Sequence, residues 1–203
     1  ILFPREACLE FAIGSAAKVL GPEFAAVYGF DARVRLPDEP LMLVDRILSI
    51  EGQKGSLGPG RIVTEHDVLP GAWYLDGEHA PVCISVEAGQ ADLFLSAYLG
   101  IDLAVKGKRT YRLLDAAVVF HRELPQPGET IRYEIEISKF IRQGDTYLFL
   151  FSFKGYIGDT ALKHQVDNQL EFVQALEVGH FRRVSRIDQR FESGLHELHA
   201  TAA

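Results

Sequence analysis

Glu87 is the residue of this sequence whose surroundings point most directly to chemistry. It lies in the segment 82–99, where most other positions are apolar, among them Ile84, Val86 and Leu93. Burial among apolar groups disfavours the charged form of a carboxyl and raises its pKa, which suits a general acid or base working near neutral pH. A second interpretation stays open, because a carboxylate near the start of a helix also stabilises the backbone N–H groups and the helix dipole there.

Polar groups close to Glu87 in the sequence add to this indication. Gln90 follows it by three residues and shares its face of a helix, so we expect Gln90 to orient the carboxyl. Asp92 follows by five residues, and a continuous helix would turn its side chain elsewhere. The backbone N–H groups of the first turn, from Cys83 to Val86, are expected to stabilise negative charge on a carbonyl oxygen.

The histidines give weaker indications. His66, in the sequence Glu65-His66-Asp67, lies at the end of a predicted strand, where we expect a structural hydrogen bond rather than proton transfer. His196 and His199 have a spacing compatible with one shared metal ion, but the sequence offers no obvious third ligand. We therefore predict no metal site.

A sheet and one helix must position these groups. Segment 82–99 is apolar on almost every face and ends at Gly100, as expected of a helix that a sheet wraps. In 131–138 apolar and polar residues alternate, which predicts a strand with one buried and one wet face. The predicted strands cover 41–50, 60–64, 111–120, 131–138, 146–156 and, as the last, 160–173.

Composition divides the chain into three parts. In 1–37, apolar side chains recur at helical spacing between residues 4 and 20, which predicts an amphipathic lead-in helix or linker. Residues 38–175 hold the predicted strands and the central helix, and we expect them to form the domain. Residues 176–203 are charged and lose the period, so we expect a tail or linker.

Charge and hydropathy exclude several function classes. The net charge of -7 argues against nucleic acid and membrane surfaces as partners, because binding to phosphates needs a positive field. No apolar run approaches the roughly 20 residues that span a bilayer. Two cysteines, Cys8 and Cys83, are too few for a disulfide framework. We therefore expect a cytoplasmic protein.

Three sequence pieces, taken in order, carry a family resemblance. They are Leu43-Val44-Asp45-Arg46-Ile47, Pro81-Val82-Cys83-Ile84-Ser85-Val86-Glu87-Ala88 with Gln90, and Phe120 with Leu124-Pro125-Gln126-Pro127-Gly128-Glu129, supported by Trp73-Tyr74-Leu75-Asp76 and Gln90-Ala91-Asp92-Leu93-Phe94-Leu95. Together they resemble the bacterial β-hydroxyacyl-acyl-carrier-protein dehydratases, with order and spacing that agree over residues 38 to 175. The fuller string is similar to the dehydratase region of bacterial polyunsaturated fatty acid synthases.

The resemblance implies an α+β hotdog fold, a curved antiparallel sheet wrapped around one long central helix. It also implies dehydration of a β-hydroxyacyl thioester during fatty acid or polyunsaturated fatty acid synthesis. The substrate would be carried on the phosphopantetheine of an acyl carrier protein, with no bound cofactor. The family pairs an acid at Glu87 with a histidine from a facing subunit or repeat, so we expect a homodimer or a second hotdog repeat.

The sequence departs from the family at the loop before the central helix. The family places a histidine where Trp73 stands here, and the loop is shorter, so His79 is the nearest replacement. The alternative interpretation is that His79 is only a solvent-exposed histidine in a loop. We therefore expect Glu87 and His79 as catalytic residues. The expected substrate contacts are Cys83, Ile84, Gln90, Phe94 and Trp73.

Two further expectations concern partners and competing functions. Lys106, Lys108 and Arg109 form a basic run in an acidic protein and are a candidate docking site for a carrier protein, since carriers of this kind are acidic. The same fold also permits a non-catalytic hotdog repeat that completes a partner's site. An acyl-thioester hydrolase that uses the carboxylate to activate water is a third possibility.

Overall fold

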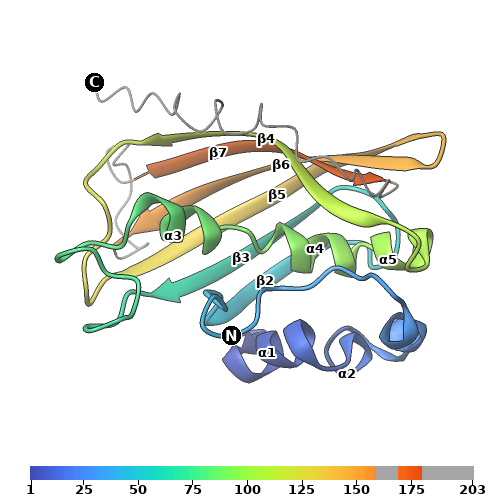
Figure 1. Ribbon diagram of the computed structural model, residues 1–203, viewed down its shortest axis with the longest axis horizontal. Helices are drawn as coiled ribbons and strands as arrows, with labels where there is room; N and C mark the ends of the chain where they lie inside the picture. Colours follow the sequence, from blue (N-terminus) through green and yellow to red (C-terminus); the bar gives the residue numbers. More distant parts are fainter. Residues whose placement is uncertain (159–168, 180–203) are drawn as a thin grey trace, which may run out of the picture.

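A seven-stranded antiparallel sheet dominates the computed structural model, which describes residues 1–158 and 169–179 (Figure 1). The strand order across the sheet is β1-β2-β3-β5-β6-β7-β4, so β4 forms one edge. The strands are β1 (Phe3–Pro4), β2 (Arg46–Gly52), β3 (Gly60–Asp67), β4 (Thr110–Phe120), β5 (Thr130–Gln143), β6 (Thr146–Ile157) and β7 (Gln169–Gly179).

The predicted alternation places one face of the sheet in the core. Ile131, Tyr133, Ile135 and Ile137 of β5 are fully buried, as the sequence pattern of 131–138 indicates. The Tyr133 hydroxyl donates a hydrogen bond of 2.6 Å to the Ser85 carbonyl, so it also ties the sheet to the helical segment that crosses it.

The helical segment lies across the concave side of the curved sheet, and the predicted hotdog architecture is confirmed (Figure 1). The predicted helix 82–99 is divided into α3 (Val82–Glu87) and α4 (Asp92–Tyr98), and a further short helix, α5 (Ile101–Val105), follows Gly100. At the break between α3 and α4, Gly89 lies against Phe153 of β6. A Cβ atom on Gly89 would lie 2.7 Å from the Phe153 ring, so only glycine permits this approach.

The N-terminal residues pack on the same core. The predicted lead-in helix is present as α1 (Arg5–Ile13) and α2 (Ala16–Leu20), followed by the 3₁₀ helix η1 (Pro22–Gly29). Phe11 of α1 is fully buried, and its ring centroid lies 4.6 Å from that of Phe94 in α4. Residues 1–37 therefore share the hydrophobic core of the sheet.

The described part of the C-terminal region is strand β7. The last strand, β7, continues to Gly179, past the predicted domain boundary at residue 175. Residues 159–168, which begin the predicted last strand, and the remainder of the predicted tail, with His196 and His199, lie outside the described residues. Among the described helices, none has the length and apolar character needed to cross a membrane.

Candidate active site

Glu87 is the last residue of α3 and is half-buried where the helical segment breaks. Burial raises the pKa of its carboxyl above the ordinary value of 4.5, in the direction expected from the apolar sequence around it. Within the described part of the chain, the Glu87 carboxyl makes no hydrogen bond. Gln90 is joined to Glu87 through the backbone, its N–H lying 3.0 Å from the Glu87 carbonyl oxygen.

Asp92 is a second carboxyl near Glu87 that was not among the predicted site residues. It begins α4, is 1% exposed, and its Oδ1 atom has no hydrogen-bond partner among the described residues. Burial raises the pKa of Asp92 well above its ordinary value, and the negative charge of Glu87 adds to the effect. The prediction that Asp92 points elsewhere assumed a continuous helix, and the break at 88–91 removes that assumption.

We expect Asp92→Asn to make the folded domain more stable at neutral pH. A carboxyl whose folded-state pKa is raised contributes stability at pH values below its unfolded pKa, near 3.8, and this contribution is lost as the pH rises toward the folded-state value. Asparagine keeps the shape but cannot ionise. Each pKa unit corresponds to about 1.4 kcal/mol. The free energy of unfolding of the wild type, measured in urea from pH 4 to 8, should therefore decline more steeply than that of the variant.

The exposed Asp31→Asn replacement is the control for this measurement, since it removes one carboxylate without touching the buried pair. It should follow the wild-type curve. Identical pH dependence in Asp92→Asn and wild type would mean that Asp92 does not ionise within this range or is not strained by burial.

In the first turn of α3, two of the four backbone N–H groups from Cys83 to Val86 already have acceptors near the helix start. The N–H groups of Ile84 and Ser85 both donate to the Pro81 carbonyl, at 3.0 and 3.1 Å. They are therefore already used and are not offered to a substrate carbonyl. Cys83 is exposed on this turn, whereas the Ile84 side chain is buried.

His79 lies beside the Leu124–Glu129 turn. Its Nδ1 atom is 3.2 Å from the Leu124 carbonyl oxygen, and the next residue, Ala80, donates its N–H to the Pro125 carbonyl at 2.7 Å. No hydrogen bond in the described ranges joins His79 to Glu87. The two predicted catalytic residues are thus not brought into hydrogen-bond contact within this chain.

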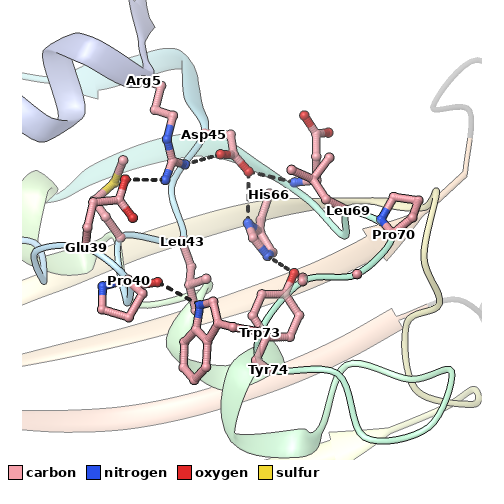
Figure 2. A pocket seen from close by; sticks show the side chains of 14 residues that line it. Arg5, Glu39, Pro40, Leu43, Asp45, His66, Leu69, Pro70, Trp73 and Tyr74 are labelled. Atoms are coloured by element: carbon pink, nitrogen blue, oxygen red, sulfur yellow. Dashed lines mark hydrogen bonds and ion pairs between the residues drawn. The ribbon is translucent and has the colours of Figure 1, made fainter.

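Two of the expected substrate contacts take other positions. Phe94 is fully buried between the rings of Phe3 and Phe11, so it belongs to the core. Trp73 is 59% exposed, and its indole N–H donates a hydrogen bond of 3.2 Å to the Pro40 carbonyl. It stands at a cavity of about 420 Å³ that Glu87, His79 and α3 do not line (Figure 2).

His66 is the centre of a buried hydrogen-bond chain in that cavity. Its Nδ1 atom lies 2.9 Å from Asp45 Oδ2 and its Nε2 atom 2.8 Å from the Tyr74 hydroxyl (Figure 2). The structural hydrogen bond predicted for His66 is confirmed. Burial acts to raise the pKa of Asp45, but hydrogen bonds from His66 and the Asp67 N–H, with the charge of Arg5, outweigh it and lower the pKa. Burial raises the pKa of Tyr74 to about 12.

The basic run follows α5. Lys106 and Lys108 are exposed. The Arg109 guanidinium, in contrast, donates a hydrogen bond of 2.8 Å to the Asp145 carbonyl and forms an ion pair with the Asp145 carboxylate at 3.4 Å. Arg109 therefore holds the turn between β5 and β6. No group of three or more His, Cys, Asp or Glu side chains suited to a metal ion occurs in the described part of the chain.

Comparisons with known proteins identify the family to which the sequence is similar. Residues 36–164 match the family described as the FabA-like domain. One component of the polyunsaturated fatty acid synthase of Thraustochytrium sp. is 36% identical over 164 residues, which cover 79% of this chain and 11% of that protein. This chain thus spans about a tenth of the length of that relative.

Similar solved structures include the dehydratase heterocomplex ApeI:P from Xenorhabdus doucetiae. It is 12% identical, with a TM-score of 0.46, over 81% of this chain and 96% of that one. Zebra fish thioesterase superfamily member 2 is 15% identical, with a TM-score of 0.44, over 68% of this chain and 83% of that one.

Proposed function

We propose, from the premise that this chain belongs to the FabA-like family of hotdog dehydratase domains, that it takes part in removing water from a β-hydroxyacyl thioester. The substrate would be held on the phosphopantetheine arm of an acyl carrier protein within a polyunsaturated fatty acid synthase. One observation carries the proposal: a carboxyl at Glu87 whose burial raises its pKa, on the helical segment that the sheet wraps. Such a carboxyl retains its proton closer to neutral pH and can donate it.

In the proposed reaction, a base removes the proton from the carbon next to the thioester carbonyl, and the C–O bond to the hydroxyl group breaks. Glu87 gives its proton to the departing hydroxyl, which leaves as water, and an enoyl thioester remains. The base would be a histidine of a facing subunit or repeat. This assignment follows from the family resemblance and from the absence of a hydrogen bond between His79 and Glu87 among the described residues.

Strand β4 is an edge of the described sheet, and we infer that a second hotdog unit pairs there. Strand β4 has 11 residues and, in the described ranges, pairs only with β7. Its outer edge offers backbone N–H and C=O groups for pairing with another strand. We therefore propose that a second copy or a second repeat adds to β4, so that this chain forms one half of a double hotdog.

We expect Val119→Asp to weaken this assembly. Val119 is 50% exposed near the end of β4, where a carboxylate would be buried without a partner if another unit packs there. Sedimentation should show a lower dimer fraction, with the dissociation constant raised at least tenfold. The control is Ile13→Asp, at an exposed position of α1. A wild-type chain that stays monomeric at high concentration would contradict the pairing proposal.

A non-catalytic repeat is the second candidate, and a specific observation favours it. Trp73 stands at the family's histidine position and His79 is bound to the Leu124 carbonyl. In that case the chain contributes Glu87, or only packing surface, to a site in its partner. Docking of the carrier protein at Lys106 and Lys108 remains a proposal that suits either candidate, because both side chains are exposed.

Product analysis separates these functions. The isolated chain and the chain joined to a repeat that carries an intact loop histidine are each given a β-hydroxyacyl thioester. We expect the enoyl thioester from the joined protein and little or none from the isolated chain. Free acid as the product would indicate a hydrolase, and no product from the joined protein would overturn the dehydratase proposal. A fully active isolated chain would make His79 the base, and His79→Ala should then abolish turnover.

A further inference from the structure

The cavity beside Trp73 is separate from the Glu87 surface and has the properties of a ligand site. Its volume of about 420 Å³ lies within the usual range for small-molecule pockets. It lies between Arg5 at the start of α1, the segment 39–45, the end of β3 and the loop 69–74 (Figure 2). Most of its wall is apolar, and of its polar side chains Asp45 and Tyr74 are hydrogen-bonded to His66.

The partners of His66 assign the direction of its hydrogen bonds. Asp45 is an acceptor only, because its carboxylate also accepts the Asp67 N–H at 2.8 Å and forms an ion pair with Arg5. The His66 Nδ1 atom must therefore carry the proton that Asp45 accepts. In the neutral ring the Nε2 atom then has no proton, so it accepts the hydroxyl proton of Tyr74.

This arrangement leaves the Tyr74 oxygen as an acceptor. Its only proton is directed to His66, so a ligand must supply a donor to bond with it. The charges of the wall restrict the ligand further. Three carboxylates, those of Glu39, Asp45 and Asp67, line the cavity together with the guanidinium of Arg5. Arg46 pairs with Asp67 at 2.7 Å from outside the cavity. The carboxylates still outnumber the guanidinium groups, so an anionic ligand is disfavoured.

We propose that this cavity binds a neutral aliphatic molecule through a hydroxyl group that donates its proton to the Tyr74 oxygen. The aliphatic part of the ligand packs on the apolar wall, which includes Leu43, Leu69 and Trp73. Leu69 and Trp73 are 61% and 59% exposed, so apolar surface is available at this wall before a ligand binds. The inference goes beyond the proposed reaction, since Glu87, the acid proposed for that reaction, does not line the cavity.

Binding of two neutral probes to the wild-type chain tests the inference. The probes are 1-hexanol and methyl pentyl ether, which are closely similar in size, although only the alcohol can donate a hydrogen bond. In titrations followed by NMR, we expect the alcohol to bind about fivefold more tightly, the effect of one added hydrogen bond. Shifts should be largest at the rings of His66 and Tyr74. Equal affinities, or shifts confined to other parts of the domain, would overturn the proposal.

The variant Tyr74→Phe provides the second arm. It removes the acceptor and should abolish the preference for the alcohol while leaving weak binding of both probes to the apolar wall. Tyr28→Phe, at a 72% exposed tyrosine outside the cavity, is the matched control and should keep the fivefold preference. A preference that survives in Tyr74→Phe would also overturn the proposal. If that variant does not fold, the two-probe comparison on the wild type still decides the question.

Discussion

Glu87→Gln is expected to lower the dehydration rate of the joined two-repeat protein by about 100-fold or more, the usual contribution of a general acid or base. Glutamine keeps the shape of the side chain but has no acidic proton to give to the departing hydroxyl group. The half-buried position and raised pKa of Glu87 are the physical basis for this expectation. Single-turnover rates with a β-hydroxyacyl thioester measure the chemical step directly.

The control for this variant is Glu136→Gln, an exposed position on the outer face of β5. It should retain the full rate. Glu87→Gln should be at least as stable in urea as the wild type, because it removes a carboxyl whose pKa burial raises, so a lower rate would not come from unfolding. A full rate in Glu87→Gln would show that the carboxyl is not the acid of the reaction. The alternative role at a helix start does not apply, because Glu87 is the last residue of α3.

Phe11→Ala is expected to lower the free energy of unfolding by about 3 to 5 kcal/mol, the usual cost of removing a buried phenylalanine ring. Phe11 is fully buried and packs on Phe94 of the central helical segment. The loss should appear in the single transition of the whole domain, because residues 1–37 share its core. Urea unfolding followed by fluorescence and by circular dichroism gives this value.

Ile13→Ala is the control, since Ile13 lies on the same helix but is 54% exposed. Its effect should stay within about 0.5 kcal/mol. Two separate transitions, or an effect of Phe11→Ala below about 1 kcal/mol, would instead make residues 1–37 an independent lead-in segment.

Sequence periodicity predicted the sheet because burial on one face imposes it directly. The alternation in 131–138 reappears as the buried face of β5, and the apolar segment 82–99 reappears as the helical segment inside the sheet. The break at Gly89 was not predicted. It depends on the approach of Phe153, a residue distant in sequence, although a glycine within a helical pattern is a signal of such an approach.

Sequence alone predicted the part of the candidate site that depends on one residue and its neighbours in the sequence. Glu87 was identified from its apolar neighbours, but the electrostatic relation between Glu87 and Asp92 depends on the unpredicted break. The hydrogen-bond chain of Asp45, His66 and Tyr74 combines residues from a loop, a strand end and a second loop. Asp45 and His66 are 21 positions apart in the sequence. Such contacts follow from strand register, which one sequence does not determine.

Direct titration of the Glu87 carboxyl tests the central claim, that burial prepares this group to hold and donate a proton. In protein labelled with ¹³C at the glutamate carboxyls, the Glu87 resonance is identified by its loss in Glu87→Gln. We predict a titration midpoint clearly above the ordinary value of 4.5. A midpoint at or below 4.5 would contradict the account, because the carboxyl would then be an ordinary ionised group with no proton to give near neutral pH.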